Sequence, residues 1–235
     1  MNILSIDTST KNFSLAVSTN GRVVRYRNIL LDKVLESSII PAIEKILKDS
    51  KLKFRELDGY AVGLGPGSFT SLRVGLSTIK AFAFATGKPV VGISSLDVIA
   101  ANVIEERADE ICVIMDARRQ QVYACLFANE GGTPKRKTDY LLTNIDDLLD
   151  RVHGKTLFVG DGVPLWREMI KEKYLKVAKK GCHALFSPEK DAVPQARNLS
   201  RLAYGRFNKK EYDDVEVLVP IYLYSQDCQV EPSKK

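Results

Sequence analysis

The segment 65–75, which reads GPGSFTSLRVG, constrains the fold of this chain more than any other. It joins an apolar, strand-like stretch at 60–64 to a long apolar stretch at 68–86. Glycine adopts backbone angles that are closed to other residues and proline fixes its own φ, so this composition predicts a tight turn from a strand into a helix. Serine and threonine favour helix N-termini, which predicts that Ser68 or Thr70 caps this helix.

The same turn is a candidate anion site. A helix N-terminus carries a partial positive charge and glycines let a ligand approach the backbone, so anions bind readily at such a junction. The segment matches neither the P-loop nor the dinucleotide-binding fingerprint, because no lysine follows Gly67 and no third glycine is in place. A plain tight turn is the alternative, and the segment alone does not decide between the two.

The composition is typical of a globular protein that works in water. The chain has 235 residues, of which 45% are hydrophobic, enough for a sizeable core shared by two subdomains. It has no run of about 20 uncharged apolar residues, and the opening MNILSID is typical of a strand rather than a signal peptide. The four cysteines form no CxxC pair, which disfavours zinc and a disulfide framework. We therefore expect a cytoplasmic protein without membrane association.

The charge of the chain leaves a nucleic-acid partner open. The net charge is +6, with basic clusters at 135–137, 171–180 and 209–210. A polyanionic partner is one explanation, and a solvated basic face is the other. These clusters have no interleaved aromatic residues and no recognisable RNA-binding motif, so the charge does not choose between them.

The order of the expected elements repeats. The first half predicts strands at 2–7, 13–19, 23–29, 60–64 and 89–93 and helices at 32–49, 68–86 and 95–107. The second half predicts strands at 111–116, 121–128, 139–142 and 156–160 and helices at 144–152 and from 164 onward. In each half an apolar strand ends in aspartate, followed by a polar turn and a second strand. We therefore expect two similar subdomains, 1–108 and 109–235.

Two aspartates mark a candidate nucleotide site. Asp7 and Asp116 end the first strand of each half, and carboxylates at strand ends facing a cleft can hold a magnesium ion on a nucleotide phosphate. The sequence GDG at 160–162 could let an adenine or ribose approach the backbone. The alternative at each position is ordinary turn chemistry. The candidate nucleotide-binding residues are Asp7, Thr8, Gly65, Gly67, Asp116 and Gly160.

No catalytic residue or metal site is expected from the histidines. His153 and His183 are the only two, and their separation excludes a pair of ligands on one helix. The chain also has no G-x-S-x-G nucleophile elbow.

The helix expected at 68–86 is apolar on several sides. An amphipathic surface helix keeps one polar face, but this one keeps little besides Arg73, Lys80 and small hydroxyls. It is either enclosed in its own subdomain, or packed between its sheet and a partner protein. We favour a dimer interface formed by this helix and the helix at 32–49 as a hypothesis.

Three blocks of the chain resemble the bacterial TsaB (YeaZ) family. They are IDTS at 6–9, GLGPGSFTSLRVG at 63–75 and DARRQQVY at 116–123, and their order and spacing, the total length and the GDG at 160–162 agree as well. The resemblance implies an α/β, actin-like (Hsp70/hexokinase-type ASKHA) fold with two similar subdomains, each with a mixed sheet flanked by helices.

The resemblance also implies a role in tRNA processing. The family, which is glycoprotease-like, contributes to threonylcarbamoyladenosine beside the anticodon of tRNAs reading ANN codons. The catalytic transfer belongs to the paralogue TsaD, so this chain would be a non-catalytic scaffold or activator that binds TsaD, with the ATPase TsaE joining the assembly. The chain alone would form a homodimer. It would have no cofactor of its own, while ATP or ADP, magnesium and tRNA would enter at the level of the complex.

Partner contacts are expected on the two N-terminal helices. The candidate partner-binding residues are Leu35, Ile39, Ile43, Leu72, Gly75 and Ile79. The chain departs from the family pattern at Ser71, usually glycine, at 32–36, where a His-Ser-Glu run is common, and at Tyr224, usually arginine. The alternative function is a magnesium-dependent small-molecule kinase or ATPase of the actin-like superfamily, built on Asp7 and Asp116.

Overall fold

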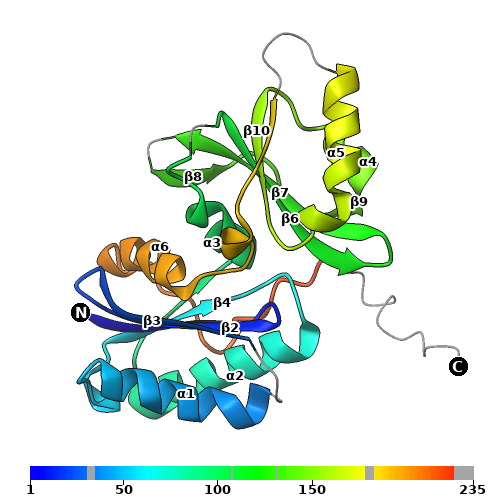
Figure 1. The fold of residues 1–235 in the computed structure, drawn as a ribbon. Helices are drawn as coiled ribbons and strands as arrows, with labels where there is room; N and C mark the ends of the chain where they lie inside the picture. Colours follow the sequence, from blue (N-terminus) through cyan, green and yellow to red (C-terminus); the bar gives the residue numbers. More distant parts are fainter. Residues whose placement is uncertain (31–34, 107, 131, 178–182, 225–235) are drawn as a thin grey trace, which may run out of the picture.

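The protein folds around two β-sheets that lie one above the other, each flanked by helices (Figure 1). This computed structural model describes residues 1–30, 35–106, 108–130, 132–177 and 183–224. Among these residues, no helix combines the length and the apolar character that crossing a bilayer would require.

The first sheet has the strand order β3-β2-β1-β4-β5. Its strands are β1 (Asn2–Asp7), β2 (Asn12–Thr19), β3 (Arg22–Leu30), β4 (Gly59–Gly63) and β5 (Val90–Ile93). The first three strands pair antiparallel, and β1, β4 and β5 pair parallel. All residues of β4 are buried, as in a central strand covered by helices on both faces.

Two helices cover one face of this sheet, and two lie on the other (Figure 1). The helices are α1 (Leu35–Asp49) and α2 (Phe69–Thr86) on one side, and α3 (Ser95–Asn102) and α6 (Ala196–Asn208) on the opposite side. The apolar residues of α1 recur at helical spacing, and this is the face it buries against the sheet. A short 3₁₀ turn, Phe54–Glu56, leads from α1 into β4.

The second sheet repeats the pairing pattern of the first. Its order is β11-β10-β6-β7-β8, with β9 paired to β7. The strands are β6 (Glu110–Arg118), β7 (Gln121–Glu130), β8 (Thr133–Arg136), β9 (Leu141–Asn144), β10 (Lys155–Val159) and β11 (His183–Phe186). Strand β6 pairs antiparallel with β7 and parallel with β10, as β1 does with β2 and β4. The expected internal repeat is therefore present at the level of sheet topology.

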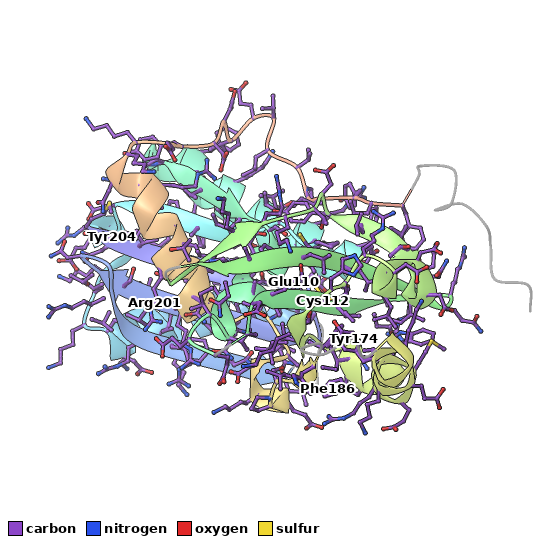
Figure 2. All side chains as sticks on the ribbon, turned by 90° about the horizontal axis from the view of Figure 1, so that it is seen from above. Glu110, Cys112, Tyr174, Phe186, Arg201 and Tyr204 are labelled. Carbon is purple, nitrogen blue, oxygen red and sulfur yellow. The ribbon has the colours of Figure 1, made fainter. Side chains whose placement is uncertain are left out.

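The outer face of the second sheet carries α4 (Ile145–Leu149) and α5 (Val163–Val177). An aromatic cluster fixes α5: the rings of Phe158 and Tyr174 meet edge to face at 5.6 Å, and Phe186 stacks on Phe158 at 5.9 Å. Figure 2 shows Tyr174, which belongs to α5, and Phe186 near each other. A second 3₁₀ turn, Glu189–Asp191, follows β11.

The C-terminal part of the chain returns to the first sheet. Helix α6 packs on β1 and β2, and Tyr204 of this helix covers the turn between β2 and β3 at Gly21 (Figure 2). In the last turn of α6, Arg206 forms a two-pronged ion pair with Asp213, which lies beyond the helix and itself accepts a hydrogen bond from the Gly92 N–H of β5. The division into two subdomains, 1–108 and 109–235, stays a prediction. Residues 196–220 pack mainly against the first sheet and its helices.

Candidate functional site

The carboxylate of Asp7, at the end of β1, is enclosed by the protein. Only 1% of this residue is exposed. Oδ1 accepts hydrogen bonds from the N–H and the hydroxyl of Ser9, at 2.9 and 2.7 Å, and Oδ2 accepts one from the hydroxyl of Ser95 at 2.7 Å. A side chain at Gly63 would overlap Oδ2. Burial raises the pKa of Asp7, against the opposing effect of these donors.

The glycine turn at 65–67 is held against the same network. The Gly65 N–H donates to Ser95 Oγ at 3.1 Å, and the Ser95 N–H donates to the Gly65 carbonyl at 2.8 Å. Gly65 has a φ of +84°, which favours glycine, and a side chain at Gly67 would overlap the carbonyl oxygen of Ser9. The glycines therefore let this turn pack closely against the loop after β1.

The predicted side-chain cap at the N-terminus of α2 is not formed. Ser68 does occupy the N-cap position, but its side chain makes no capping hydrogen bond. Its hydroxyl pairs with that of Ser71 at 3.0 Å instead, and Thr70 lies exposed in the first turn.

Thr8 and Gly75 form a tight contact between the first loop and α2. The Thr8 hydroxyl donates to the Ser71 carbonyl at 2.7 Å, and a Cβ atom at position 75 would overlap that hydroxyl. The serine at position 71, which departs from the family pattern, supplies only its backbone to this bond. Thr8 is 1% exposed, so its hydroxyl is used inside the chain.

The corresponding aspartate of the second sheet is more open. The side chain of Asp116 is 25% exposed and forms an ion pair with Arg118 at 3.2 Å. Its N–H donates to Asp161 Oδ1 at 3.2 Å. A side chain at Gly160 would overlap the carbonyl oxygen of Ile114. The glycines at 160 and 162 thus let this turn pack directly on β6.

A cavity of about 540 Å³ opens between the two sheets. Its lining residues come from the loop after β1, the start of α2, the end of β6 and the start of α5. Of the candidate nucleotide-binding residues, Gly67 and Asp116 line it, whereas Asp7, Thr8, Gly65 and Gly160 do not. The structure therefore does not bring the two aspartates together in one open site.

A second cavity, of about 440 Å³, lies beside the first and was not expected from the sequence. It is lined by Gly67, Phe69, Ala117, Arg118, Arg119, Tyr123, Ile221, Tyr222, Leu223 and Tyr224. The signal was in two motifs, DARRQQVY at 116–123 and PIYLY at 220–224, but only the fold places them side by side. Tyr224 donates to the Ala117 carbonyl at 2.6 Å and so ties the end of the described chain to β6.

The residues expected to bind a partner lie in the core of this chain, which corrects that expectation. Leu35, Ile39, Ile43, Leu72, Gly75 and Ile79 are all buried, with no side chain more than 6% exposed. They pack α1 and α2 onto the first sheet and onto the loop after β1. The outward face of the same helices carries Ile40 at 42% exposure and Phe84 at 63%, together with the small exposed residues Ser77 and Ala81.

Neither histidine belongs to a metal-binding cluster of the described residues. His153 and His183 are both exposed. Across the described ranges, no group of three or more His, Cys, Asp or Glu side chains is arranged to hold a metal ion.

Comparisons with known proteins agree with the resemblance found in the sequence. The family model "TsaD: tRNA N6-adenosine threonylcarbamoyltransferase" matches residues 32–233. The Bacillus subtilis tRNA threonylcarbamoyladenosine biosynthesis protein TsaB is 30% identical over 226 residues, covering 95% of this chain and 94% of that protein.

Two solved structures are similar in fold. YeaZ from Pseudomonas aeruginosa has a TM-score of 0.77 at 23% identity, over 94% of this chain and 99% of that one. The activator of the 2-hydroxyisocaproyl-CoA dehydratase from Clostridium difficile, solved with bound ADPNP, has a TM-score of 0.52 at 12% identity, over 91% and 99%. The expected α/β fold of the actin-like class, with two mixed sheets flanked by helices, is thereby confirmed. This chain belongs to the TsaB (YeaZ) proteins of the TsaD family.

Proposed function

We propose that this chain is a non-catalytic subunit that supports a TsaD-type enzyme in forming threonylcarbamoyladenosine in tRNA. The link to threonylcarbamoyladenosine formation comes from the names of the relatives. The argument against catalysis by this chain is the burial of the Asp7 carboxylate. A magnesium ion needs carboxylate oxygens that it and its waters can reach. The three donors around Asp7 and the packing of Gly63 deny this access.

The partner would dock on the outward face of α1 and α2. This face combines the apolar side chains of Ile40 and Phe84 with the small residues Ser77 and Ala81, which let a second helix approach closely. Large apolar side chains exposed together on adjacent helices are a common mark of protein contact surfaces. We propose the same face for a homodimer of the chain alone, so that TsaD and a second copy would compete for it.

The remaining parts of the assembly are part of the same proposal. TsaE would join the complex formed with TsaD, nucleotide and magnesium would be bound there rather than by this chain alone, and the site of action would be the cytoplasm. The kinase or ATPase alternative is not favoured, because it needs Asp7 and Asp116 in one accessible site.

Reconstitution with TsaD tests the proposal. Cells or extracts lacking this chain should lose threonylcarbamoyladenosine from their tRNA, and the purified chain should restore it only together with TsaD. The Asp7→Asn variant should restore it as well, in proportion to its folded fraction. Turnover of ATP by the isolated chain that Asp7→Asn abolishes would overturn the proposal.

A further inference from the structure

The cavity of about 440 Å³ described above has the make-up of a ligand site rather than of a packing defect. It lies where three segments meet: the first residue of α2, the turn between β6 and β7, and the segment 221–224. Its volume is typical of small-molecule pockets.

Aromatic rings form the wall of this cavity. The rings of Phe69 and Tyr222 lie 5.3 Å apart, and each residue is 39% exposed. Arg73 holds the pair together, since its guanidinium lies 3.8 Å from the Phe69 ring centre and its Nε donates to the Tyr222 hydroxyl at 3.1 Å. Deeper in, Tyr123 meets Tyr224 edge to face at 6.0 Å. Flat, pre-positioned rings of this kind are suited to stacking against another flat ring.

Two arginines on the β6–β7 turn supply positive charge beside these rings. Arg118 and Arg119 adopt left-handed backbone conformations, with φ of 67° and 48°. Arg118 is paired with Asp116 at 3.2 Å. Arg119 is exposed and forms no ion pair within the part of the chain that the structure describes, so its charge is available for a ligand.

We propose that this cavity binds one nucleotide unit, with the base stacked on the aromatic wall at Tyr222 and the phosphate held by Arg119. An apolar ligand would leave the arginine charge unused, and an inorganic anion would leave the aromatic wall uncovered. A nucleotide satisfies both, because aromatic stacking and arginine–phosphate contacts are the two means by which proteins hold unpaired nucleotides.

The nucleotide unit belongs either to an unpaired stretch of RNA or to a free mononucleotide. Both offer a base for stacking and a phosphate for the arginine. This site differs from the candidate nucleotide site expected from the sequence, because it uses neither Asp7 nor Asp116 as a magnesium ligand. The inference does not depend on TsaD, so binding by the isolated chain tests it separately from the proposed function.

Equilibrium binding of the purified full-length chain provides the test, with a short unpaired adenine-rich RNA in one arm and AMP in the other. Tyr222→Ala should weaken binding about 5- to 150-fold, the range for loss of one stacked base. Arg119→Glu should weaken it and, in the RNA arm, lower the slope of log affinity against log salt by about 1.

Two matched variants serve as controls. Tyr212→Ala removes a tyrosine of similar exposure outside the cavity, and Arg55→Glu makes the same charge change on the 3₁₀ turn after α1. Both should bind like the unaltered chain, and thermal melting should show that all four variants fold. If both site variants weaken binding in one arm, that result supports the site, and the arm identifies whether its ligand is RNA or a free mononucleotide. No binding in either arm, or equal loss in the control variants, would overturn it.

Discussion

The hydroxyl of Ser95 donates a 2.7 Å hydrogen bond to Asp7 Oδ2, and this bond joins the end of β1 to the start of α3, 88 residues further along the chain. Ser95 Oγ also accepts from the Gly65 N–H, so the aspartate, the glycine turn and the helix form one network. Asp7 therefore stabilises the fold by joining these three segments.

Asp7→Asn should destabilise the protein by about 1–3 kcal/mol, the cost of leaving a buried polar group mispaired. The Ser9 N–H and the Ser9 and Ser95 hydroxyls all donate to Asp7, whereas the asparagine side chain can accept with only one of its two polar atoms. Urea unfolding measures the loss. Asp58→Asn, at a carboxylate that is 48% exposed, is the matched control and should change stability much less.

The buried Asp7 carboxyl also predicts a pH dependence. Its pKa is raised from 3.8 in the folded protein, so the folded state binds the proton more tightly than the unfolded state does. The stability that this group contributes is full below the unfolded pKa and is lost as the pH rises through the folded pKa. The unaltered chain should therefore lose stability relative to Asp7→Asn as the pH rises above about 3.8. A difference that is constant with pH would contradict this.

Gly75→Ala should destabilise the protein by about 1–3 kcal/mol through overpacking, because the new methyl group would meet the Thr8 side chain. Adding Thr8→Ala should recover part of the loss, since the added Cβ then faces the Thr8 Cβ at 3.2 Å. Urea unfolding of the double-mutant cycle measures this coupling. Gly205→Ala on α6 meets nothing within 4 Å and should be neutral or stabilising. Strict additivity of the two changes at 8 and 75 would contradict the contact.

The sequence predicted the elements whose periodicity is strong and local. Strands β1, β2 and β4 and helix α2 lie within a residue or two of their expected bounds. Helix α6 was missed, although Leu199, Ala203 and Phe207 recur every four residues and form its buried face. Strand β8 was missed because its short, basic sequence, TPKR, has no apolar alternation.

The sites were harder to predict than the elements, for a physical reason. Periodicity identifies the apolar face of a helix but not what covers that face. For α1 and α2 the cover is the chain's own first sheet, so the apolar residues chosen for docking are core residues. Likewise, the strand-end position of Asp7 gave no sign that Ser95, far along the chain, would enclose it. The aromatic cavity requires segments 69, 117–123 and 221–224 together, which only tertiary structure provides.

Ile40→Glu and Ser77→Arg should weaken binding to TsaD without unfolding the chain. Both residues are exposed on the outward face of α1 and α2, so a charge there remains solvated in the free protein but is desolvated or clashes in a complex. We expect about a tenfold or greater loss of affinity for each, a cost of the order of 1.4 kcal/mol or more. Pull-down with TsaD and nucleoside analysis of the modified tRNA measure the effect, and both readouts should fall together.

Met169→Glu, at 38% exposure on α5, makes the same kind of change on the second sheet and should leave both readouts intact. The homodimer gives an independent check, since the two variants on α1 and α2 should sediment as monomers while Met169→Glu sediments as the unaltered chain does. If Ile40→Glu and Ser77→Arg fold, bind TsaD normally and support modification, the contact face lies elsewhere. The outward residues of α1 and α2 would then be ordinary solvated surface, and the cavity at Tyr222 and Arg119 would be the stronger candidate for a functional contact on this chain.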